Sequence, residues 1–418
     1  MSDQLMFWVS RKLGQLAEFA GSRIGNASVI GGRIALKVFP RFLQQARRRI
    51  DFPIVFVMGS NGKTTTSKYI VDLAEAQGEV VLNNNSGSNM TTGIASLIIS
   101  AWREILNKKY SLGVFEIDEG YAEAMAKDLL PEHAVVLNVQ IDQIYRLHEP
   151  ERVADMFSRT MNFVQKNIIV NGNDEMLVGA VEKSPLEARV SYFGFEGDSY
   201  RDLGLFRPIR LGQARDVFSV RKSDSKFKIS LGVESHDLLP PSAGLHFAMN
   251  AAAAIAAATR TFASAASIQV LADTLAKSKP AFGRGESITS GNAQFDVILF
   301  KNRASLQLNL NSVRTPATTI VLAFDEYSQD PSWLFAIDYS SLQKVDYVSG
   351  EKADFLELAL EYAGIPVGKR IESIKEVVQE LEAKYKNAPN PSLHRMYLDY
   401  DQMIATRDYF GLKIGKTS

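Results

Sequence analysis

Apolar and polar residues alternate along this chain in a pattern that predicts strands followed by helices. An apolar run at 52–58 ends in a glycine turn, and residues 63–77 then have helical periodicity up to Gly78. Four further apolar runs have the length of strands and are separated by helical stretches: 79–84, 110–118, 134–139 and 167–172. Strands and helices that alternate at this spacing favour a mainly parallel sheet with helices on both faces. The predicted fold class is therefore α/β.

Changes in this pattern predict the domain organisation. The first 48 residues have helical periodicity interrupted by glycines, and Pro40 is expected to separate two short helices. Side chains from about 185 to 240 alternate between polar and apolar, which predicts antiparallel strands. We expect an N-terminal helical segment at 1–48, a central domain at 49–288 that contains the antiparallel part, and a smaller C-terminal α/β domain at 289–418.

Composition excludes several classes of protein. Hydrophobic residues make up 46% of the chain and charged residues 22%, which are the proportions of a globular protein. The 47 basic residues balance 47 acidic ones, so no overall field favours nucleic acid and no nucleic-acid partner is expected. The chain contains no cysteine, which excludes disulfides, a cysteine-ligated zinc ribbon and a cysteine nucleophile. The five histidines lack metal-binding spacing, and we expect no zinc.

The sequence also bears on location. No apolar run reaches the 18 residues of a membrane span, and the apolar patch near Met1 is too short for a signal peptide. These features predict a cytoplasmic protein. Residues 1–50 hold nine Lys or Arg but only Asp3 and Glu18 as acids. Two interpretations remain open: a solvated helical hairpin, or a peripheral contact with the inner face of the membrane.

The sequence VFVMGSNGKTTTSKYI, at 55–70, has the context of a phosphate-binding loop. A strand, a glycine turn and a helix follow one another, so backbone N–H groups at the helix N-terminus would face an anion. Lys63 would reach the outer phosphates, and the hydroxyl of Thr64 could bind magnesium. A full G-x-x-x-x-G-K-[ST] motif would have glycine where this chain has Val57, so the loop is a variant of that motif.

This variant resembles the G-x-N-G-K-T-T loop of the Mur ligase superfamily, which also includes folylpolyglutamate synthases. These enzymes phosphorylate a carboxylate with ATP, and an amine then displaces the phosphate. The resemblance implies a Mur ligase-like central P-loop ATPase domain that uses ATP and Mg²⁺. FEIDEG resembles the family's acidic strand end, which makes Glu116 a magnesium ligand beside Thr64 and, with Lys63, a catalytic residue. The loop residues assigned to ATP are Gly59, Asn61, Gly62, Lys63, Thr64 and Thr65.

Further segments match this family in order along the chain. NVQIDQ resembles a segment near the active site and assigns Asn138 and Asp142 to the substrate region, although Ile141 replaces the family's arginine. The alanine-rich segment GLHFAMNAAAA carries Asn250 where the family contacts adenine. FGRGE places Arg284 in the family's G-R-x-E and adds it to the ATP-binding set. The resemblance therefore implies one nucleotide site assembled from distant parts of the chain.

Three C-terminal segments resemble the MurT family, the ligase subunits of lipid II isoglutaminyl synthases: LFKNRASLQLNL, LAFDEYSQDPSWLFAIDY and VSGEKADFLELALEYAGI. This resemblance implies ATP-dependent amidation of the D-glutamate α-carboxylate of lipid II through an acyl phosphate, in peptidoglycan biosynthesis. It also implies a heterodimer with a glutamine amidotransferase of GatD type, which supplies ammonia. The lack of a cysteine nucleophile in this chain agrees with that division of labour.

DPSW matches the family's Asp-x-Ser-Trp, in which an aspartate is thought to orient the partner's catalytic histidine. Asp330 is therefore a catalytic candidate, although an aspartate before proline also commonly begins a turn. KNRAS replaces the family's Lys-Asn-Pro-Ala-Gly but keeps Lys301 and Asn302, which we assign to the substrate region. SYRDLGLFRPIR lies where many members have a four-cysteine zinc ribbon, so a shortened ribbon or a hairpin is expected there.

Two other functions remain open at this stage. One is an amino-acid-adding ligase of Mur or folylpolyglutamate type, but its C-terminal Asp-Tyr-x-His-Asn-Pro sequence is absent from this chain. The other is a non-catalytic ATP-binding scaffold, for which the altered NVQIDQIY segment is the argument. The intact Lys63, Thr64 and Glu116 favour a working ligase over a scaffold.

Overall fold

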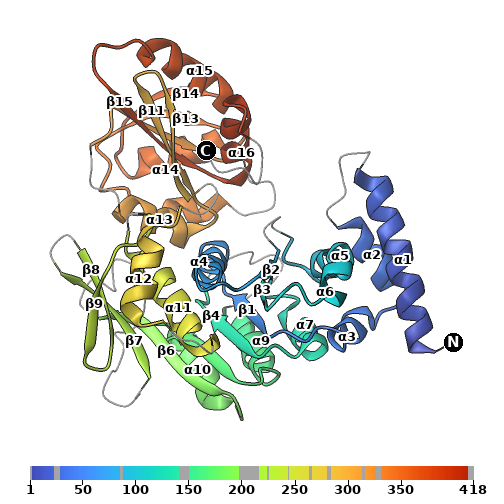
Figure 1. Ribbon diagram of the computed structural model, residues 1–418. Coiled ribbons are helices and arrows are strands. Elements are labelled where there is room, and N and C mark those ends of the chain that lie inside the picture. Colours follow the sequence, from blue (N-terminus) through green and yellow to red (C-terminus); the bar gives the residue numbers. More distant parts are fainter. Residues whose placement is uncertain are drawn as a thin grey trace.

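The computed structural model describes most of the chain. The described residues are 2–22, 29–84, 88–140, 150–196, 216–223, 226–242, 244–262, 266–279, 284–312, 316–325 and 331–412. They form two sheets with helices on both faces, and the C-terminal sheet lies above the larger one in Figure 1. The α/β fold with mainly parallel sheets, predicted from the sequence, is confirmed.

The larger sheet has nine strands in the order β2-β3-β1-β4-β5-β6-β7-β8-β9. The strands are β1 Ile54–Met58, β2 Val81–Asn83, β3 Leu112–Glu116, β4 His133–Val136, β5 Asn167–Asn171, β6 Arg189–Glu196, β7 Val217–Ser223, β8 Lys226–Leu231 and β9 Glu234–Leu238. Pairing is parallel from β2 to β7 and antiparallel from β7 to β9. The parallel strands therefore end at one edge of the sheet, where the phosphate loop begins.

Helices cover both faces of this sheet. They are α4 Lys63–Ala76, α5 Thr91–Ser100, α6 Trp102–Leu106, α7 Ala122–Leu129, α9 Pro150–Met161, α10 Glu175–Lys183, α11 Leu245–Thr261 and α12 Ile268–Ala276. Strand β1 is buried throughout because its side chains alternate between two cores. Ile54, Phe56 and Met58 pack into the core beneath α5, α7 and α9, whereas Val55 and Val57 pack against α4 and α11.

The structure corrects one expectation about the segment from 185 to 240. Strand β6 was expected to be antiparallel, but it pairs in parallel with β5 and with β7. The reason is the crossover helix α10, which lies between β5 and β6 and returns the chain in the same direction. Only the β7-β8-β9 part is antiparallel among the described strands of this segment. The SYRDLGLFRPIR region, where a shortened ribbon or hairpin was expected, lies outside the described residues.

The N-terminal segment forms three helices at one side of the larger sheet: α1 Asp3–Ser22, α2 Ile30–Val38 and α3 Phe42–Arg47. Pro40 lies between α2 and α3, as predicted. Helix α1 packs on α2, and α2 packs on α5. Phe42 and Ala35 bury their side chains in the same core as Ile54 and Phe56, so the segment is part of the folded domain.

The C-terminal sheet has six strands in the order β10-β11-β15-β12-β13-β14. They are β10 Arg284–Ser290, β11 Ala293–Leu299, β12 Thr319–Ala323, β13 Val345–Ser349, β14 Val367–Ile371 and β15 Ser392–Leu398. The helices are α13 Arg303–Ser312, α14 Ala353–Tyr362, α15 Ile374–Tyr385 and α16 Tyr400–Tyr409, with the 3₁₀ helix η2 at Pro331–Ala336. Among the described strands of this sheet, only β10 and β11 pair antiparallel. Because this hairpin includes β10, the second sheet begins before residue 289.

Candidate active site

The phosphate loop connects the end of β1 to the start of α4. Gly59 and Gly62 have φ angles of +139° and +87°, in the left-handed half of backbone space that favours glycine. A Cβ built on Gly62 would lie 2.6 Å from Oδ1 of Asn250, a residue of α11. The loop is therefore shaped for close backbone approach, and the N-terminus of α4 is free of a side-chain cap. Backbone N–H groups in this arrangement form a site for an anion such as phosphate.

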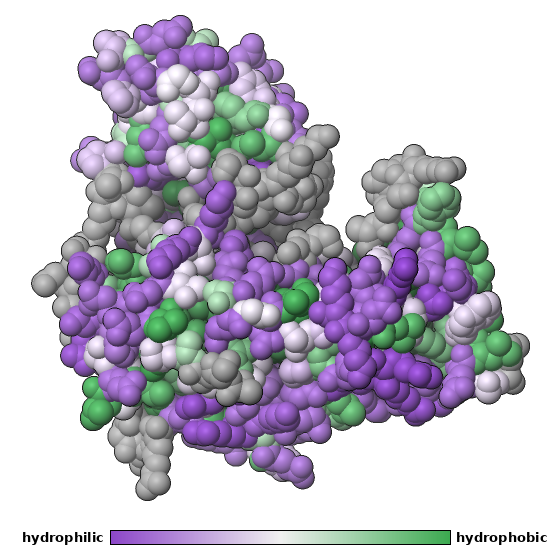
Figure 2. Space-filling model, in the orientation of Figure 1, coloured by the Kyte–Doolittle hydropathy of each residue, from purple (hydrophilic) through white to green (hydrophobic). Residues whose placement is uncertain are grey.

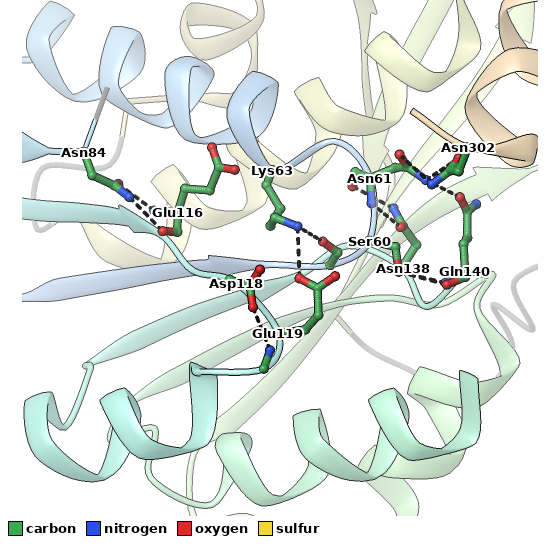
Figure 3. A network of polar contacts seen from close by, with 12 residues as sticks. Ser60, Asn61, Lys63, Asn84, Glu116, Asp118, Glu119, Asn138, Gln140 and Asn302 are labelled. Atoms are coloured by element: carbon green, nitrogen blue, oxygen red, sulfur yellow. Dashed lines mark hydrogen bonds and ion pairs between the residues drawn. The ribbon is translucent and has the colours of Figure 1, made fainter. Parts of the chain in front are cut away.

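Asparagine side chains hold the loop against the end of β4. The backbone N–H of Asn61 donates to Oδ1 of Asn138 at 2.8 Å, and Nδ2 of Asn138 donates back to the Asn61 carbonyl at 3.0 Å. Ser60 and Gln140 add bonds on the same side, including Nδ2 of Asn61 to Oε1 of Gln140 at 2.6 Å (Figure 3). This reciprocal pairing fixes the loop backbone before any ligand arrives.

Lys63 is buried beside this loop and is held by two acceptors. Its Nζ donates to the Gly59 carbonyl at 2.6 Å and lies 3.1 Å from Oε2 of Glu119. The side chains of Lys63 and Glu119 are only 8% and 3% exposed. A charge this deeply buried needs a partner, and Glu119 provides one on the same side of the loop (Figure 3).

Three carboxylates follow one another at the end of β3, the strand beside β1. Glu116, Asp118 and Glu119 are 9%, 7% and 3% exposed. The side chain of Asn84 accepts from the backbone N–H of Glu116 at 2.9 Å and donates to its carbonyl at 2.8 Å. These two bonds fix the backbone position of Glu116. Carboxylate oxygens and a hydroxyl are suitable ligands for Mg²⁺, which usually takes few protein ligands and completes its shell with phosphate oxygens and water. Glu116 and the half-buried Thr64 fit this chemistry.

A buried aspartate, Asp174, forms a hydrogen bond with the backbone of the residue after Asn138. Oδ2 of Asp174 accepts the backbone N–H of Val139 at 2.7 Å, and its Oδ1 accepts two N–H groups at the start of α10. Burial raises the pKa of Asp174 above its usual value, against the lowering effect of these backbone hydrogen bonds. The same carboxyl therefore caps a helix and anchors the segment that holds the phosphate loop.

The C-terminal domain contacts the phosphate loop through Asn302. Nδ2 of Asn61 lies 3.4 Å from Oδ1 of Asn302, and Nδ2 of Asn302 lies 3.5 Å from Oδ1 of Asn61. Asn302 is 2% exposed, and its Oδ1 also accepts the backbone N–H of Ser305 in the first turn of α13. The neighbouring Lys301 is half-buried at the same edge. Asn302 thus joins the start of α13 to the phosphate loop.

The structure brings together most residues assigned from the sequence. Around the loop lie Gly59, Asn61, Gly62, Lys63, Thr64, Thr65, Glu116, Asn138, Asn250, Lys301 and Asn302. Thr65 is fully buried, unlike Thr64. Asp142 and Asp330 lie outside the described residues, and the backbone of Arg284 begins β10 while its side chain is not described. Their assigned roles stay predictions.

Sequence reasoning missed the second partner of the loop lysine. Glu119 lies in the same FEIDEG segment as Glu116, but only Glu116 was assigned a role. The available signal was position, because the ends of neighbouring parallel strands such as β1 and β3 meet at one edge of the sheet. Ser60, Asn84 and Gln140 were also missed: Ser60 and Asn84 bond the backbone and Gln140 bonds the side chain of Asn61, and such hydrogen bonds leave no pattern in the sequence.

The sequence of this chain is similar to those of known proteins. Residues 57–258 match the Mur ligase middle domain. The chain is 24% identical over 439 aligned residues to the MurT subunit of lipid II isoglutaminyl synthase from Streptococcus pneumoniae, covering 94% of this chain and 96% of that protein. It is 32% identical to MurT from Staphylococcus aureus strain COL over 168 residues, which cover 40% of this chain and 37% of that protein.

Solved structures with similar folds include Mur ligases. MurF from Acinetobacter baumannii superposes with a TM-score of 0.69 at 16% identity, over 91% of this chain and 80% of that one. MurF from Thermotoga maritima, solved in complex with ADP, gives a TM-score of 0.66 at 14% identity, over 89% and 82% of the two chains. The fold is that of Mur ligases. The chain therefore has a Mur ligase-like fold with a Mur ligase middle domain, and its curated homologues are MurT subunits of lipid II isoglutaminyl synthase.

Proposed function

We propose that this chain is the ligase subunit of a lipid II isoglutaminyl synthase. It would convert the D-glutamate α-carboxylate of the lipid II stem peptide to a carboxamide with ATP and ammonia. The carboxylate oxygen first attacks the γ-phosphorus of ATP, which gives an acyl phosphate and ADP. Ammonia then forms the new C–N bond, inorganic phosphate leaves with the C–O electron pair, and a proton is lost. This chemistry belongs to cell-wall synthesis at the cytoplasmic face of the membrane.

The observation that carries this proposal is the similarity to a MurT subunit from end to end. It spans 94% of this chain and 96% of that protein, so it includes the C-terminal domain as well as the nucleotide domain. The named function of that relative is lipid II isoglutaminyl synthesis with glutamine hydrolysis. An ADP complex of a protein with the same fold supports ATP as the phosphoryl donor.

The loop geometry supports specific roles for its residues. Lys63 would exchange Glu119 for the outer phosphates, because both acceptors compete for one ammonium group. Thr64 and Glu116 would hold Mg²⁺, which offsets the charge on the phosphoryl group when bound. Asn250 lies against Gly62 and is the candidate for contact with the base, and Arg284, which begins β10, would belong to the same ATP-binding set. Asn138, Asp142, Lys301 and Asn302 would border the acceptor carboxylate.

A separate glutaminase of GatD type would supply the ammonia. This part of the proposal rests on the word "subunit" in the name of the relative and on the lack of any cysteine in this chain, since a glutaminase of that class needs a cysteine nucleophile. Asp330 would orient the catalytic histidine of the partner across the interface. It immediately precedes η2, the short helix at Pro331–Ala336.

The direct test supplies the purified chain with Mg²⁺, ATP, detergent-solubilised lipid II and an ammonium salt. ADP release and carboxamide formation by mass spectrometry are the readouts. We expect both, and we expect Lys63→Ala to lose both. ADP release with formation of a peptide bond to an added amino acid, and no carboxamide from ammonium, would indicate an amino-acid-adding ligase. No turnover even with the glutaminase and glutamine would support the scaffold.

The partner's role is tested by Asp330→Asn in the reconstituted complex. We expect this variant to lose the glutamine-dependent reaction and to keep the reaction driven by free ammonium, because the ligase site is unchanged. Loss of both reactions would instead place Asp330 in the ligase site or in the folding core. A glutaminase with a cysteine nucleophile, encoded next to this protein, would be an independent sign of the partnership.

A further inference from the structure

Helix α1 presents large apolar side chains to solvent along most of its length. Figure 2 shows them as a green band over α1 at the right-hand edge of the molecule. The exposed fractions are Leu5 48%, Trp8 55%, Leu13 41%, Leu16 65% and Phe19 62%. Positions 5, 8, 12, 16 and 19 are three or four residues apart, so they lie on one face of the helix, and Leu13 lies beside this face. We call Leu5, Trp8, Leu13, Leu16 and Phe19 the α1 patch.

The face of α1 that packs on the protein is made of smaller and more polar residues. Ser10 is fully buried, and a Cβ on Gly14 would lie 2.9 Å from the Gly31 carbonyl of α2. Met6 and Phe7 are the larger apolar side chains that pack on the core, and Phe7 stacks at 5.0 Å on Phe42. A surface helix of a soluble domain normally turns its large apolar residues inward. Helix α1 also leaves large apolar residues on its outer face, and an exposed patch of this kind marks an interaction surface.

Charges around the α1 patch are mainly positive. Lys12 is exposed on the same face, within the row of apolar residues. The helix has two acids: Asp3 lies 3.9 Å from the cation of Arg41, and Glu18 accepts a hydrogen bond from Ser100 at 2.9 Å and lies off the row of positions 5, 8, 12, 16 and 19. Exposed cations also occur on the neighbouring short helices, at Arg33, Lys37 and Arg41.

We propose that the α1 patch lies in the interface of an anionic phospholipid membrane, with α1 parallel to the surface. Leucine, phenylalanine and tryptophan on one face, with lysine and arginine beside them, are typical of interfacial helices. Among the described residues no helix is long and apolar enough to cross a bilayer, so a surface position is the one that this helix can take.

The patch suits a lipid surface better than a protein partner. A stable protein interface takes roughly 20 to 30 residues a side, whereas the α1 patch is a single row on one helix. The positive charge complements anionic headgroups. This inference stands on the geometry of α1 and does not depend on the proposed reaction, although it would bring the active site to a lipid-linked substrate.

The test mixes the full chain with phosphatidylcholine vesicles, with and without phosphatidylglycerol, and measures sedimentation with the vesicles. Trp8 is also a direct reporter, because it is 55% exposed whereas Trp102 is 7% exposed. We expect binding to the anionic vesicles, a shift of tryptophan emission to shorter wavelength, and weaker binding at high salt. Equal binding to both vesicle types, or binding to neither, would overturn the proposal.

Matched variants assign the binding to α1. Leu16→Gln with Phe19→Gln removes two side chains of the α1 patch and should weaken vesicle binding by about tenfold or more. Phe355→Gln with Leu358→Gln is the control, since these residues have the same spacing and are 43% and 53% exposed on α14. Lys12→Glu should reduce the preference for anionic vesicles, and Lys12→Arg should keep it.

Two further outcomes would show that the α1 patch does not bind an anionic membrane. If the wild-type chain self-associates in sedimentation velocity and Leu16→Gln with Phe19→Gln abolishes this, the face belongs to a second copy and the proposal is wrong. If both double variants lose vesicle binding equally, the binding is nonspecific and the proposal is also wrong. The amidation assay uses detergent-solubilised lipid II, so failure of membrane binding and failure of the proposed reaction are observed separately.

Discussion

At the scale of single residues, Gly62 is the position where one added carbon would disturb the site most. Its φ is +87°, and a Cβ would lie 2.6 Å from Oδ1 of Asn250. Gly78, at the other end of α4, also has a φ of +87° but has open space around it. Gly62→Ala and Gly78→Ala should each lose about 1 kcal/mol of unfolding free energy from backbone strain. Only Gly62→Ala should weaken ATP binding, measured by calorimetry, and equal ATP affinities would contradict the close approach of Asn250.

The ion pair of Lys63 with Glu119 predicts a stability that depends on nucleotide. Glu119→Gln should lower the unfolding free energy by about 3 kcal/mol without ATP, because a buried ammonium loses its charged partner. Saturating ATP should restore most of this loss, since phosphate oxygens then neutralise Lys63. Urea unfolding with and without ATP measures both values. Glu116→Gln is the comparison, and a loss that ATP does not reduce would show that Glu119 acts on the fold alone.

Residues within one continuous motif could be assigned from the sequence, and contacts between distant segments could not. Asn61 and Lys63 were identified because strand, loop and helix follow one another directly. Glu119 was missed as the partner of Lys63, and so was the contact of Asn61 with Asn302, which are 241 residues apart. Such pairs depend on how strands and domains pack, and no spacing along the chain encodes them.

At the scale of elements, two histidines on buried strands predict that the unfolding free energy falls in acid. Burial lowers the pKa of His133 on β4 and of His394 on β15 to about 4. Lys166 lowers the pKa of His133 further, while Asp346 and Lys384 have opposite effects on that of His394. Both pKa values lie below the unfolded value near 6.5, so the stabilisation is complete above pH 6.5 and is lost as the pH falls toward 4.

Each histidine should contribute up to about 3 kcal/mol to this loss. The unfolding free energy, measured by urea at pH values from 7 to 4, is expected to fall steeply for the wild type. His133→Gln with His394→Gln should flatten the profile. A steep profile that survives in the double variant would assign the acid sensitivity to other groups.

Element prediction succeeded where burial produced an apolar run and failed where it did not. Strand β1 is buried on both faces and has five apolar residues in succession. Strand β14, Val367–Ile371, lies at the edge of its sheet and is mostly exposed, so its sequence gives no strand signal. Strand β15 is buried in the middle of the sheet, but it carries the polar residues His394 and Arg395. Its sequence therefore lacks the apolar run that would have predicted a buried strand. The direction of β6 depends on the crossover by α10 rather than on its own alternation.

At the scale of the whole molecule, the sequence predicted two α/β domains but not how they meet. The structure joins them at Asn302, which both accepts the backbone N–H of Ser305 at the start of α13 and contacts Asn61 of the phosphate loop. These two roles can be separated, because aspartate serves as well as asparagine at a helix start. Asn302→Asp should keep the stability of the C-terminal domain but place a negative charge beside the phosphate loop.

We therefore expect Asn302→Asp to weaken ATP binding roughly tenfold or more, since like charges a few ångströms apart repel by about 1 kcal/mol even in water and by more at a buried position such as this one. Asn302→Ala should lose about 1 kcal/mol of unfolding free energy with a smaller effect on ATP. Calorimetric titration of ATP and urea unfolding of both variants measure the two effects independently. If Asn302→Asp binds ATP like the wild type, the two domains do not meet at the loop in the ATP-binding state. The contact of Asn302 with Asn61 would then belong to the nucleotide-free arrangement alone, and domain movement would be part of the catalytic cycle.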